Sequence, residues 1–296
     1  MITVIIITHN RSFFLKRSLM SLSLQTKKAD EVIVVDNNSS DDTKKIVLGF
    51  KNKLPIKYVF EKNKSFGNAR NTGVKNAKGD IILFIDDDCL AEKYWLETLY
   101  KETLKNYDIA GGSRTVLGEN IFSWTDYFIT AGPLLNPKLK RKERFNLSTS
   151  NVAIKKSVFN KIGFFNKQLP LAEDRDFFLR AKNKGLKLIF SPKAKVKDIG
   201  FSKNLTTLIT RMKRYGFGIM ASYLKQKDNE PLSKYFSKNI IILTLLSPIY
   251  ISLETIYTLL RNIKQSPIII LYTPLLIISF IFWHYGMIKS LAENNQ

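Results

Sequence analysis

The chain contains an uninterrupted apolar run, Ile81–Ile85, that ends in three consecutive aspartates, Asp86, Asp87 and Asp88. Five apolar residues without a polar break are typical of a strand buried on both faces, as in a parallel sheet. Ligands of open α/β sheets bind beyond the carboxyl ends of the strands, which is where these aspartates fall. Carboxylates this close together repel one another, so the cluster is expected to hold a cation, a proton or basic partners.

A helix cap is the alternative interpretation of the aspartates. Aspartate is a favoured N-cap, and a helix is expected shortly afterwards, at about residues 91–104. A cap needs one acid rather than three. Taken alone, the triplet leaves both interpretations open, and the choice depends on whether other strand ends supply polar partners.

The first two hundred residues alternate short apolar runs with polar helical segments. The expected strands are 2–7, 31–35, 56–60, 81–85 and 108–116, and the expected helices include 12–25, 41–50 and 91–104. This alternation predicts an α/β fold with βαβ units and a mostly parallel sheet between flanking helices. Neither G-x-G-x-x-G nor a P-loop follows the first strand, so the usual phosphate-binding loops are not expected.

Polar residues follow three of the predicted strands. Thr8, Asn10 and Arg11 come after the first strand, Asp36 comes after the second, and the aspartates come after the fourth. Because the carboxyl ends of parallel strands lie at one edge of a sheet, we expect these side chains to converge. Carboxylate oxygens beside a phosphate-bearing substrate suit Mg²⁺ or Mn²⁺.

Five separate segments carry distinct motifs. They are residues 8–11 (THNR), 34–41 (VVDNNSSD), 63–73 with ARN at 69–71, 84–88 (FIDDD) and 173–174 (ED). Together and in this order they resemble the family 2 glycosyltransferases, which have the nucleotide-sugar-binding GT-A (Rossmann-like) fold. The resemblance covers roughly residues 2–190. The Q-x-x-R-W pattern of processive polysaccharide synthases is absent, so addition of single sugars is expected.

The resemblance implies a site for a nucleotide-sugar donor. In the family the aspartate after the second strand holds the nucleoside, and the D-x-D aspartates bind the ribose and, through a divalent metal, the diphosphate. The implied donor-binding residues are Thr8, Asn10, Arg11, Asp36, Arg70, Asn71, Asp86 and Asp87, and the implied ligands of Mg²⁺ or Mn²⁺ are Asp86 and Asp88. A turn aspartate bonded to its own backbone is the alternative for Asp36, and a solvated helix face is the alternative for Arg70.

The Glu-Asp pair at residues 173–174 opens a predicted helix. Acids are favoured in a first helical turn by the helix dipole, whatever their function. In the family the aspartate of this pair is the general base that deprotonates the acceptor hydroxyl, which corresponds to Asp174. Single displacement with inversion needs no enzyme nucleophile. The expected acceptor-side or supporting residues are Ser150, Asn151, Glu173, Asp176 and Arg180.

Composition narrows the class of protein further. The chain has 47 lysine and arginine residues and 25 acidic residues, which gives a net charge of +22 and favours an anionic partner. Genome-wide enrichment in lysine is the alternative explanation. One cysteine, Cys89, excludes an internal disulfide, and two histidines are too few for a usual zinc site. The N-terminus lacks the features of a signal peptide. These observations favour a protein that faces the cytoplasm.

Apolar residues concentrate after Asn239. Two runs, 239–260 and 267–288, are long enough to cross a bilayer, and the first contains Glu254 near its far end. The preceding segment, 201–238, has eight basic and two acidic residues, a net charge of +6, and suits a helix on anionic lipid. An interfacial first run and a soluble helical hairpin are alternatives. Nucleic-acid binding is not expected, because the run that follows is more apolar than a nucleic-acid module.

The sequence therefore predicts three regions: a GT-A catalytic domain at 1–200, a basic amphipathic interfacial segment at 201–238, and a C-terminal transmembrane helical hairpin at 239–296. The implied function is inverting, metal-dependent sugar transfer from a nucleotide sugar to a lipid-linked or surface-glycan acceptor, at the cytoplasmic side of the cell membrane. A sugar nucleotidylyltransferase and a non-catalytic membrane scaffold are the alternatives. The first would need a glycine-rich basic loop after the first strand, and the intact acids argue against the second.

Overall fold

The computed structural model describes residues 1–118, 120–131, 138, 140–143, 147–225, 239–264 and 266–294. The chain forms two compact units. The first consists of Met1–Leu117, Leu134–Lys167 and Glu173–Gly200, and the second consists of Gly118–Pro133, Gln168–Ala172 and Phe201–Gln296.

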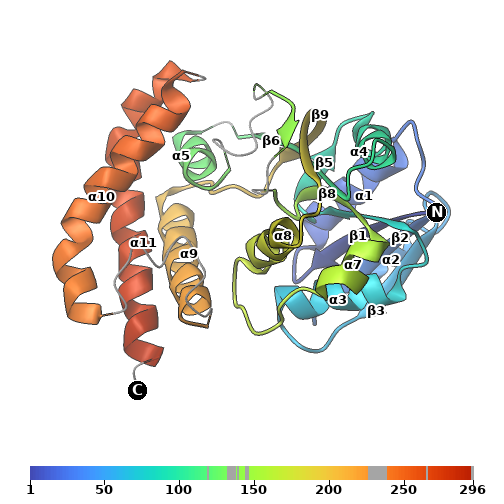
Figure 1. Ribbon diagram of the computed structural model, residues 1–296, viewed down its shortest axis with the longest axis horizontal. Helices are drawn as coiled ribbons and strands as arrows, with labels where there is room; N and C mark the ends of the chain where they lie inside the picture. Colours follow the sequence, from blue (N-terminus) through green and yellow to red (C-terminus); the bar gives the residue numbers. More distant parts are fainter. Residues whose placement is uncertain are drawn as a thin grey trace. The chain divides into compact units, whose positions relative to one another are not determined.

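A single sheet forms the centre of the first unit (Figure 1). Its described strands are β1 (Ile2–Thr8), β2 (Glu31–Asp36), β3 (Ile56–Phe60), β4 (Ile81–Ile85), β5 (Cys89–Ala91), β6 (Ile109–Val116), β7 (Lys142–Glu143), β8 (Asn151–Lys155) and β9 (Leu188–Asp198). Their order is β3-β2-β1-β4-β8-β6-β9-β5, with β7 paired to β9. Strands β1 to β4, β6 and β9 run in one direction, and β5, β7 and β8 run in the other. The predicted mostly parallel α/β sheet is confirmed.

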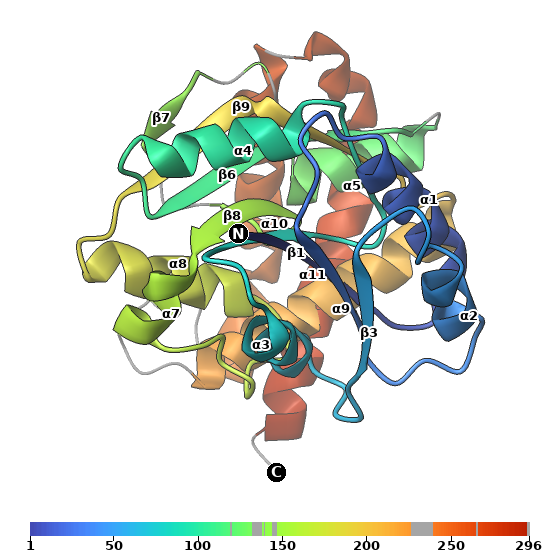
Figure 2. The same ribbon diagram turned by 90° about the vertical axis from the view of Figure 1, so that its right-hand side faces the viewer.

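Six helices of the described residues flank this sheet (Figure 2). They are α1 (Ser12–Ser23), α2 (Thr43–Leu48), α3 (Phe66–Asn76), α4 (Trp95–Leu104), α7 (Lys156–Ile162) and α8 (Glu173–Asn183). The helix expected from residue 91 begins only at Trp95, because Cys89–Ala91 pairs with β9 as a short strand. The N-cap of α4 is Tyr94, so the interpretation of the aspartates as caps of this helix is wrong.

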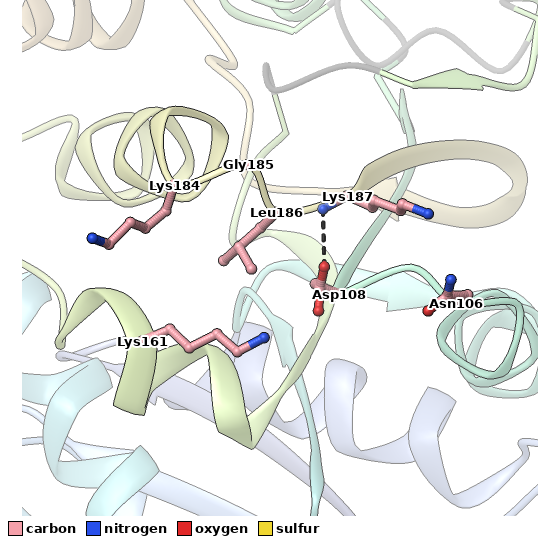
Figure 3. Close-up of a pocket in the computed structure, with 7 residues that line it drawn as sticks. All are labelled: Asn106, Asp108, Lys161, Lys184, Gly185, Leu186 and Lys187. Carbon is pink, nitrogen blue, oxygen red and sulfur yellow. Dashed lines mark hydrogen bonds between the residues drawn. The ribbon is translucent and has the colours of Figure 1, made fainter.

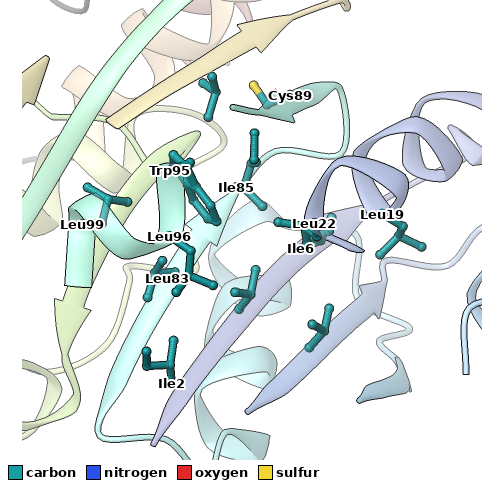
Figure 4. Packing of buried hydrophobic residues seen from close by; sticks show 14 of the residues in the cluster. Ile2, Ile6, Leu19, Leu22, Leu83, Ile85, Cys89, Trp95, Leu96 and Leu99 are labelled. Carbon is teal, nitrogen blue, oxygen red and sulfur yellow. The ribbon is translucent and has the colours of Figure 1, made fainter. Parts of the chain in front are cut away.

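Alternate residues of the strands point to opposite faces of the sheet, as the period of two requires. Ile6 and Leu83 belong to a core beneath α1, α2 and α4, whereas Ile5 and Phe84 belong to a second core beneath α3, α7 and α8. Figure 4 shows the first core, with side chains of α1 and α4 packed over β1 and β4. Since both faces are covered, the carboxyl edge of the sheet is the place left for a site.

Asn151, at the start of β8, is buried and joins three elements. It accepts a hydrogen bond from Trp95 Nε1 at 2.7 Å through Oδ1, and its Nδ2 donates to the carbonyl oxygens of Ser113 (2.7 Å) and Ala194 (2.9 Å). A Cβ atom at Gly112 would overlap both this amide and the Ala194 carbonyl. Close backbone approach therefore requires glycine at residue 112, and the Asn151 side chain is fully used within the fold.

The second unit is helical. Its described elements are α5 (Ile121–Thr130), α9 (Leu205–Lys225), α10 (Ile240–Ile263), the 3₁₀ helix η2 (Pro267–Tyr272) and α11 (Thr273–Asn294). Helices α9 and α11 approach so closely that a Cβ atom at Gly216 would overlap the Trp283 carbonyl, and one at Gly286 would overlap the Lys213 carbonyl. Two glycines thus permit the contact between these helices.

The two apolar C-terminal helices are present as predicted, with spans of 24 residues (Ile240–Ile263) and 28 residues (Pro267–Asn294). The expected interfacial segment is described only up to residue 225; residues 226–238 lie outside the described part. The apolar residues Leu208, Met212 and Met220 of α9 are buried, and Met220 packs with residues of α10 and α11. The interfacial role of this segment and the boundaries at residues 200 and 238 stay predictions.

Replacing Asn151 by alanine is expected to destabilise the chain by about 2–5 kcal/mol, because it leaves two buried carbonyls and an indole N–H without partners. Chemical unfolding of the detergent-solubilised chain measures this change. Asn52→Ala, at an exposed position, is the control and should change the free energy of unfolding by less than about 0.5 kcal/mol. Equal stabilities of the two variants would contradict the structural role of Asn151.

Candidate active site

The predicted site residues gather at the carboxyl edge of the sheet in the first unit. Thr8 of β1 lies opposite Asp36 of β2, and Ile85, the last residue of β4, lies opposite Asn151 of β8. The aspartate triplet follows Ile85 directly. The convergence expected from three strand ends is therefore present in the fold.

Asp87 and Asp88 are held from the end of β1. Thr8 Oγ1 donates to Asp87 Oδ2 at 2.7 Å. Arg11 Nη1 lies 3.3 Å from Asp87 Oδ1, and Arg11 Nη2 donates to Asp88 Oδ2. Asp87 is 4% exposed and Asp88 is 6% exposed, so this guanidinium neutralises charge that water does not reach.

Burial raises the pKa of Asp87 to about 8; the guanidinium of Arg11 opposes this shift, and the neighbouring Asp88 adds to it. Burial alone would lower the pKa of Arg11, but the carboxylates of Asp88 and Asp87 outweigh it and the pKa rises. One arginine thus does not offset the burial of Asp87 beside two other acids, and a further cation would favour the charged form of this carboxyl group.

Asp86 and Asp88 fit a divalent metal. One oxygen of each, together with Cys89 Sγ, lie within 4.8 Å of one another. Burial, followed by the charge of Asp198, raises the pKa of the Cys89 thiol, so the sulfur keeps its proton and is a poor ligand. Two carboxylates remain, which is the usual protein contribution to Mg²⁺ bound beside substrate phosphates.

A turn after β9 closes against Asp88. The Ile199 amide donates to the Asp88 carbonyl at 2.9 Å, and the Gly200 amide donates to Asp198 Oδ1 at 2.7 Å. Asp198 is in turn paired with Arg114, whose Nη1 lies 3.4 Å from Asp198 Oδ2. A Cβ atom at Gly200 would overlap Asp88 Oδ2 and lie 2.7 Å from Arg11 Nη2. Glycine is thus needed where the backbone passes the carboxylate.

The end of β2 supplies a second acidic position. Asp36 Oδ1 accepts from the Ser39 amide at 2.8 Å, and Oδ2 accepts from the Tyr58 hydroxyl at 2.7 Å. Burial and this hydrogen bond raise the pKa of Tyr58 to about 12. Asn10, with φ 53°, accepts from the Ser40 amide at 2.7 Å and so joins the loops after β1 and β2. Asp36 therefore bonds to the backbone of its own turn and also lies at the carboxyl edge of the sheet, where the aspartate triplet is.

A buried ion pair links the triplet to the start of α8. Arg70 Nη1 donates to Glu173 Oε1, and Arg70 Nη2 lies 3.9 Å from Asp86 Oδ1. Burial raises the pKa of Glu173; Arg70 opposes the shift and Asp174 adds to it. Arg70 is 6% exposed, so it is not on a solvated helix face.

Asp174 follows Glu173 in the first turn of α8. Its Oδ2 accepts from the Thr149 amide at 3.4 Å, and its Oδ1 accepts from the Arg175 amide at 2.8 Å. Ala172 immediately before this turn has φ 61°, a left-handed conformation that costs a non-glycine residue about 1 kcal/mol or more. The chain thus enters α8 in a fixed direction that sets the position of Asp174.

Other predicted residues have structural partners. Asn71 donates to the Phe165 carbonyl at 2.8 Å and accepts from its amide at 2.9 Å. Arg180 pairs with Asp176 at 2.8 Å and donates to the Phe164 carbonyl at 2.9 Å. Ser150 Oγ donates to Ser148 Oγ at 3.0 Å. These contacts hold the loops around the site, and the donor-binding role of Asn71 stays a prediction.

Sequence reasoning missed four residues of the edge: Tyr58, Arg114, Asp198 and Gly200. The alternation of side chains along β3 indicates only on which face of the sheet Tyr58 lies. It does not indicate the hydrogen bond to Asp36, which is 22 positions away in the sequence. Asp198 is the last residue of a strand, as Asp36 is, and an acid at that position is a signal in the sequence. The sequence around Gly200 does not indicate its importance, because the residues that a Cβ atom there would displace, Asp88 and Arg11, are distant in the sequence.

A separate pocket of about 560 Å³ lies near the starts of β6 and β9 (Figure 3). Its lining residues are Asn106, Asp108, Lys161, Lys184, Gly185, Leu186 and Lys187. Since β6 and β9 run in the same direction as β4, this pocket is at the amino edge of the sheet, opposite the aspartates. The side chains of Lys184 and Lys187 point away from each other in Figure 3. We assign it no part in the chemistry of the acidic edge.

Comparison with known proteins agrees with this geometry. A sequence model described as Glycosyl transferase family 2 matches residues 3–163, more than half of the chain. Glycosyltransferase AglE of Haloferax volcanii is 29% identical over 64% of this chain and 64% of its own length. Glycosyltransferase GlyA of Streptococcus pneumoniae is 36% identical over 38% of this chain but only 16% of its own length. The chain thus matches less than two thirds of the length of these relatives.

A further relative is the GalNAc(5)-diNAcBac-PP-undecaprenol beta-1,3-glucosyltransferase of Campylobacter jejuni, 36% identical over 36% of this chain and 35% of its own length. Among solved structures, residues 1–349 of S. aureus TarS in complex with UDP-GlcNAc match with a TM-score of 0.56 and 16% identity, over 100% of this chain and 91% of that one. At this identity the match shows a shared fold, and it confirms the expected GT-A architecture.

Replacing Gly200 by alanine is expected to weaken Mn²⁺ binding at least about tenfold, because the added methyl group would displace the Asp88 carboxylate. Mn²⁺ titration followed by electron paramagnetic resonance measures the affinity. Gly49→Ala, where the new Cβ meets neighbours at 3.4 Å or more, is the matched control and should bind as the wild type does. Unchanged binding in Gly200→Ala would show that Asp88 is not a ligand.

Proposed function

The chain belongs to glycosyl transferase family 2, and we propose that it transfers a sugar from a nucleoside diphosphate sugar to a hydroxyl group of an acceptor, with inversion at the anomeric carbon. One observation carries the proposal: Arg70 lies between Asp86, whose carboxylate is within 4.8 Å of that of Asp88, and Glu173, the residue before Asp174. A donor-binding pair and a candidate base thus belong to one connected network.

The donor part would use the edge formed by β1, β2 and β4. Asp36 and Tyr58 form a hydrogen-bonded pair at the nucleoside end, and each oxygen of Asp36 has a second lone pair for a base or ribose donor. Arg11 and Thr8 hold the triplet in place. The UDP-GlcNAc complex of TarS, a protein of the same fold, supports a nucleoside diphosphate sugar as donor.

Asp86 and Asp88 would hold Mg²⁺ or Mn²⁺, which when bound offsets the charge of the leaving diphosphate. Asp174 would accept the proton of the acceptor hydroxyl as its oxygen bonds to the anomeric carbon and the nucleoside diphosphate departs. One displacement needs no covalent intermediate, so it inverts the anomeric configuration. Backbone amides of Thr149 and Arg175 fix both oxygens of this carboxylate.

The acceptor is proposed to be lipid-linked or a surface glycan. The Campylobacter jejuni relative is named for an undecaprenol-linked acceptor. In the second unit of this chain, the outward residues of α10 are large and apolar and include Ile241, Leu245, Ile249, Leu253, Ile256 and Leu260. Its buried residues are mostly polar and include Ser247, Thr255, Thr258 and Asn262. Helices in lipid have apolar residues on the outside and small or polar residues at their contacts. Helices of proteins in water bury their apolar residues and expose their polar ones.

Polar contacts inside the helical unit support the same arrangement. His284 of α11 is buried, with Nε2 3.1 Å from Glu254 Oε2 and Nδ1 3.2 Å from Ser247 Oγ. Ionisable groups in lipid are expected to pair with one another within the protein. A helix of 24 residues is about 36 Å long and exceeds the hydrocarbon thickness of about 30 Å.

We therefore propose residues 1–200 as the catalytic domain, 201–238 as an interfacial segment and 239–296 as a membrane region, with the catalytic domain at the cytoplasmic face. The single buried Cys89 and the basic residues before α10 favour this side of the membrane. The non-catalytic scaffold is the competing proposal, and loss of transfer in acid-to-amide variants separates the two.

Asp88→Asn is expected to lose binding of the nucleotide with Mn²⁺, whereas Asp174→Asn is expected to keep this binding and lose sugar transfer. A thermal shift with a panel of nucleoside diphosphates and Mn²⁺ should show stabilisation of the wild type and of Asp174→Asn, but not of Asp88→Asn. Transfer should fall at least about a hundredfold in Asp174→Asn, because the base is lost. Asp176→Asn is the control for charge in the same helical turn. Unchanged transfer in both site variants would favour the scaffold.

Leu245→Lys combined with Leu253→Lys is expected to release the chain from membranes, since each lysine costs about 2.5–3.5 kcal/mol near the bilayer centre. Alkaline carbonate extraction of membranes measures this. Leu48→Lys with Leu104→Lys, at exposed positions of the first unit, is the control and should stay membrane-bound. A wild-type chain recovered in the soluble fraction without detergent would contradict membrane attachment.

A further inference from the structure

Arg70 is shared between two acids of different function. It donates to Glu173 Oε1 through Nη1, and its Nη2 lies 3.9 Å from Asp86 Oδ1. The side chains of Arg70 and Glu173 are 8% and 5% exposed, whereas that of Asp86 is 33% exposed. A buried cation thus lies between the acid that precedes the candidate base and an acid of the candidate metal pair.

The sharing is unequal. The contact with Glu173 is a direct hydrogen bond, whereas 3.9 Å to Asp86 is longer than one. A guanidinium keeps its charge at all physiological pH values, so it needs a carboxylate partner when buried. The rings of Phe66 and Phe165 lie 5.8 and 5.9 Å from the guanidinium carbon and restrict its other positions. Without the charge of Glu173, Asp86 becomes its nearest partner.

We propose that Glu173 sets the affinity of the site for a divalent metal by holding Arg70 away from Asp86. This inference rests on the proposed function, because it takes Asp86 and Asp88 as the metal-binding pair. A guanidinium hydrogen-bonded to Asp86 competes with a metal ion for the same carboxylate oxygens. Glu173 is therefore a positioning residue that acts through Arg70 and does not itself touch the metal.

The same contact couples the two halves of the site. A metal ion held by Asp86 would weaken the attraction between Asp86 and Arg70, so that Glu173 would be the main partner of Arg70. Glu173 directly precedes Asp174, so this pairing fixes the first turn of α8 in which the base lies. Because coupling between binding events is reciprocal, whatever orders this turn also favours metal binding.

Mn²⁺ titration of the detergent-solubilised full chain, without donor or acceptor, tests the proposal. Glu173→Gln is expected to bind Mn²⁺ about 3–10 times more weakly than the wild type, because Arg70 moves to Asp86. Arg70→Met combined with Glu173→Gln is expected to bind at least as tightly as the wild type, because the competitor is gone. Glu97→Gln, an acid of α4 paired with Lys101, is the control and should stay within about twofold.

Two results would overturn the inference. Equal weakening in Glu173→Gln and in the double variant would mean that the charge of Glu173 acts directly on the metal, and unchanged binding in Glu173→Gln would mean that it does not act at all. If Glu173→Gln does not fold, Glu173→Asp replaces it; a carboxylate set back from Arg70 is expected to give an intermediate loss, and wild-type affinity there would contradict the proposal. A wild type that binds no Mn²⁺ would contradict the proposed function itself, whereas equal affinities of wild type and Glu173 variants contradict this inference alone.

Discussion

The balance of charge at the end of β4 constrains the rest of the first unit. Three acids in a row follow a strand that both cores cover. Asp87 and Asp88 are buried, so water does not solvate their carboxyl groups, whereas the side chain of Asp86 is 33% exposed. Arg11 from the end of β1 and Arg70 from α3 supply two positive charges, and each is held by rings as well as by carboxylates. The cluster of acids is what supports the proposal of a cation site at this edge.

Close backbone approaches give the edge its shape. Gly112 lets β6 pass the buried amide of Asn151, and Gly200 lets the turn after β9 pass Asp88. In each case a methyl group would displace a side chain that bonds several elements at once. The acidic edge therefore depends on strands that are distant in the sequence, and its geometry is a property of the whole sheet rather than of the D-x-D segment.

The pattern of the sequence predicts strands β1 to β4, strand β6 and the acids after β2 and β4, because these depend on local periodicity and on where strands end. It does not predict strand β9, which lies between β6 and β5 in the sheet. It failed where the partner is distant. The three-residue strand β5 is fixed by pairing with β9, about a hundred residues away, so the sequence indicated a helix start there instead. The side-chain amide of Asn71 is hydrogen-bonded to the backbone of Phe165, and apolar residues of α9 are buried. Neither segment of the sequence indicates its partner.

Asp86 and Asp88 are proposed to hold a metal ion beside the diphosphate of a nucleotide. Crystals grown with Mn²⁺ and a nucleoside diphosphate, measured at a wavelength where manganese scatters anomalously, test it most directly. We expect an anomalous peak between the carboxylates of these two residues, in contact with the diphosphate. A nucleotide bound at this edge without such a peak, or a peak at other residues, would contradict it.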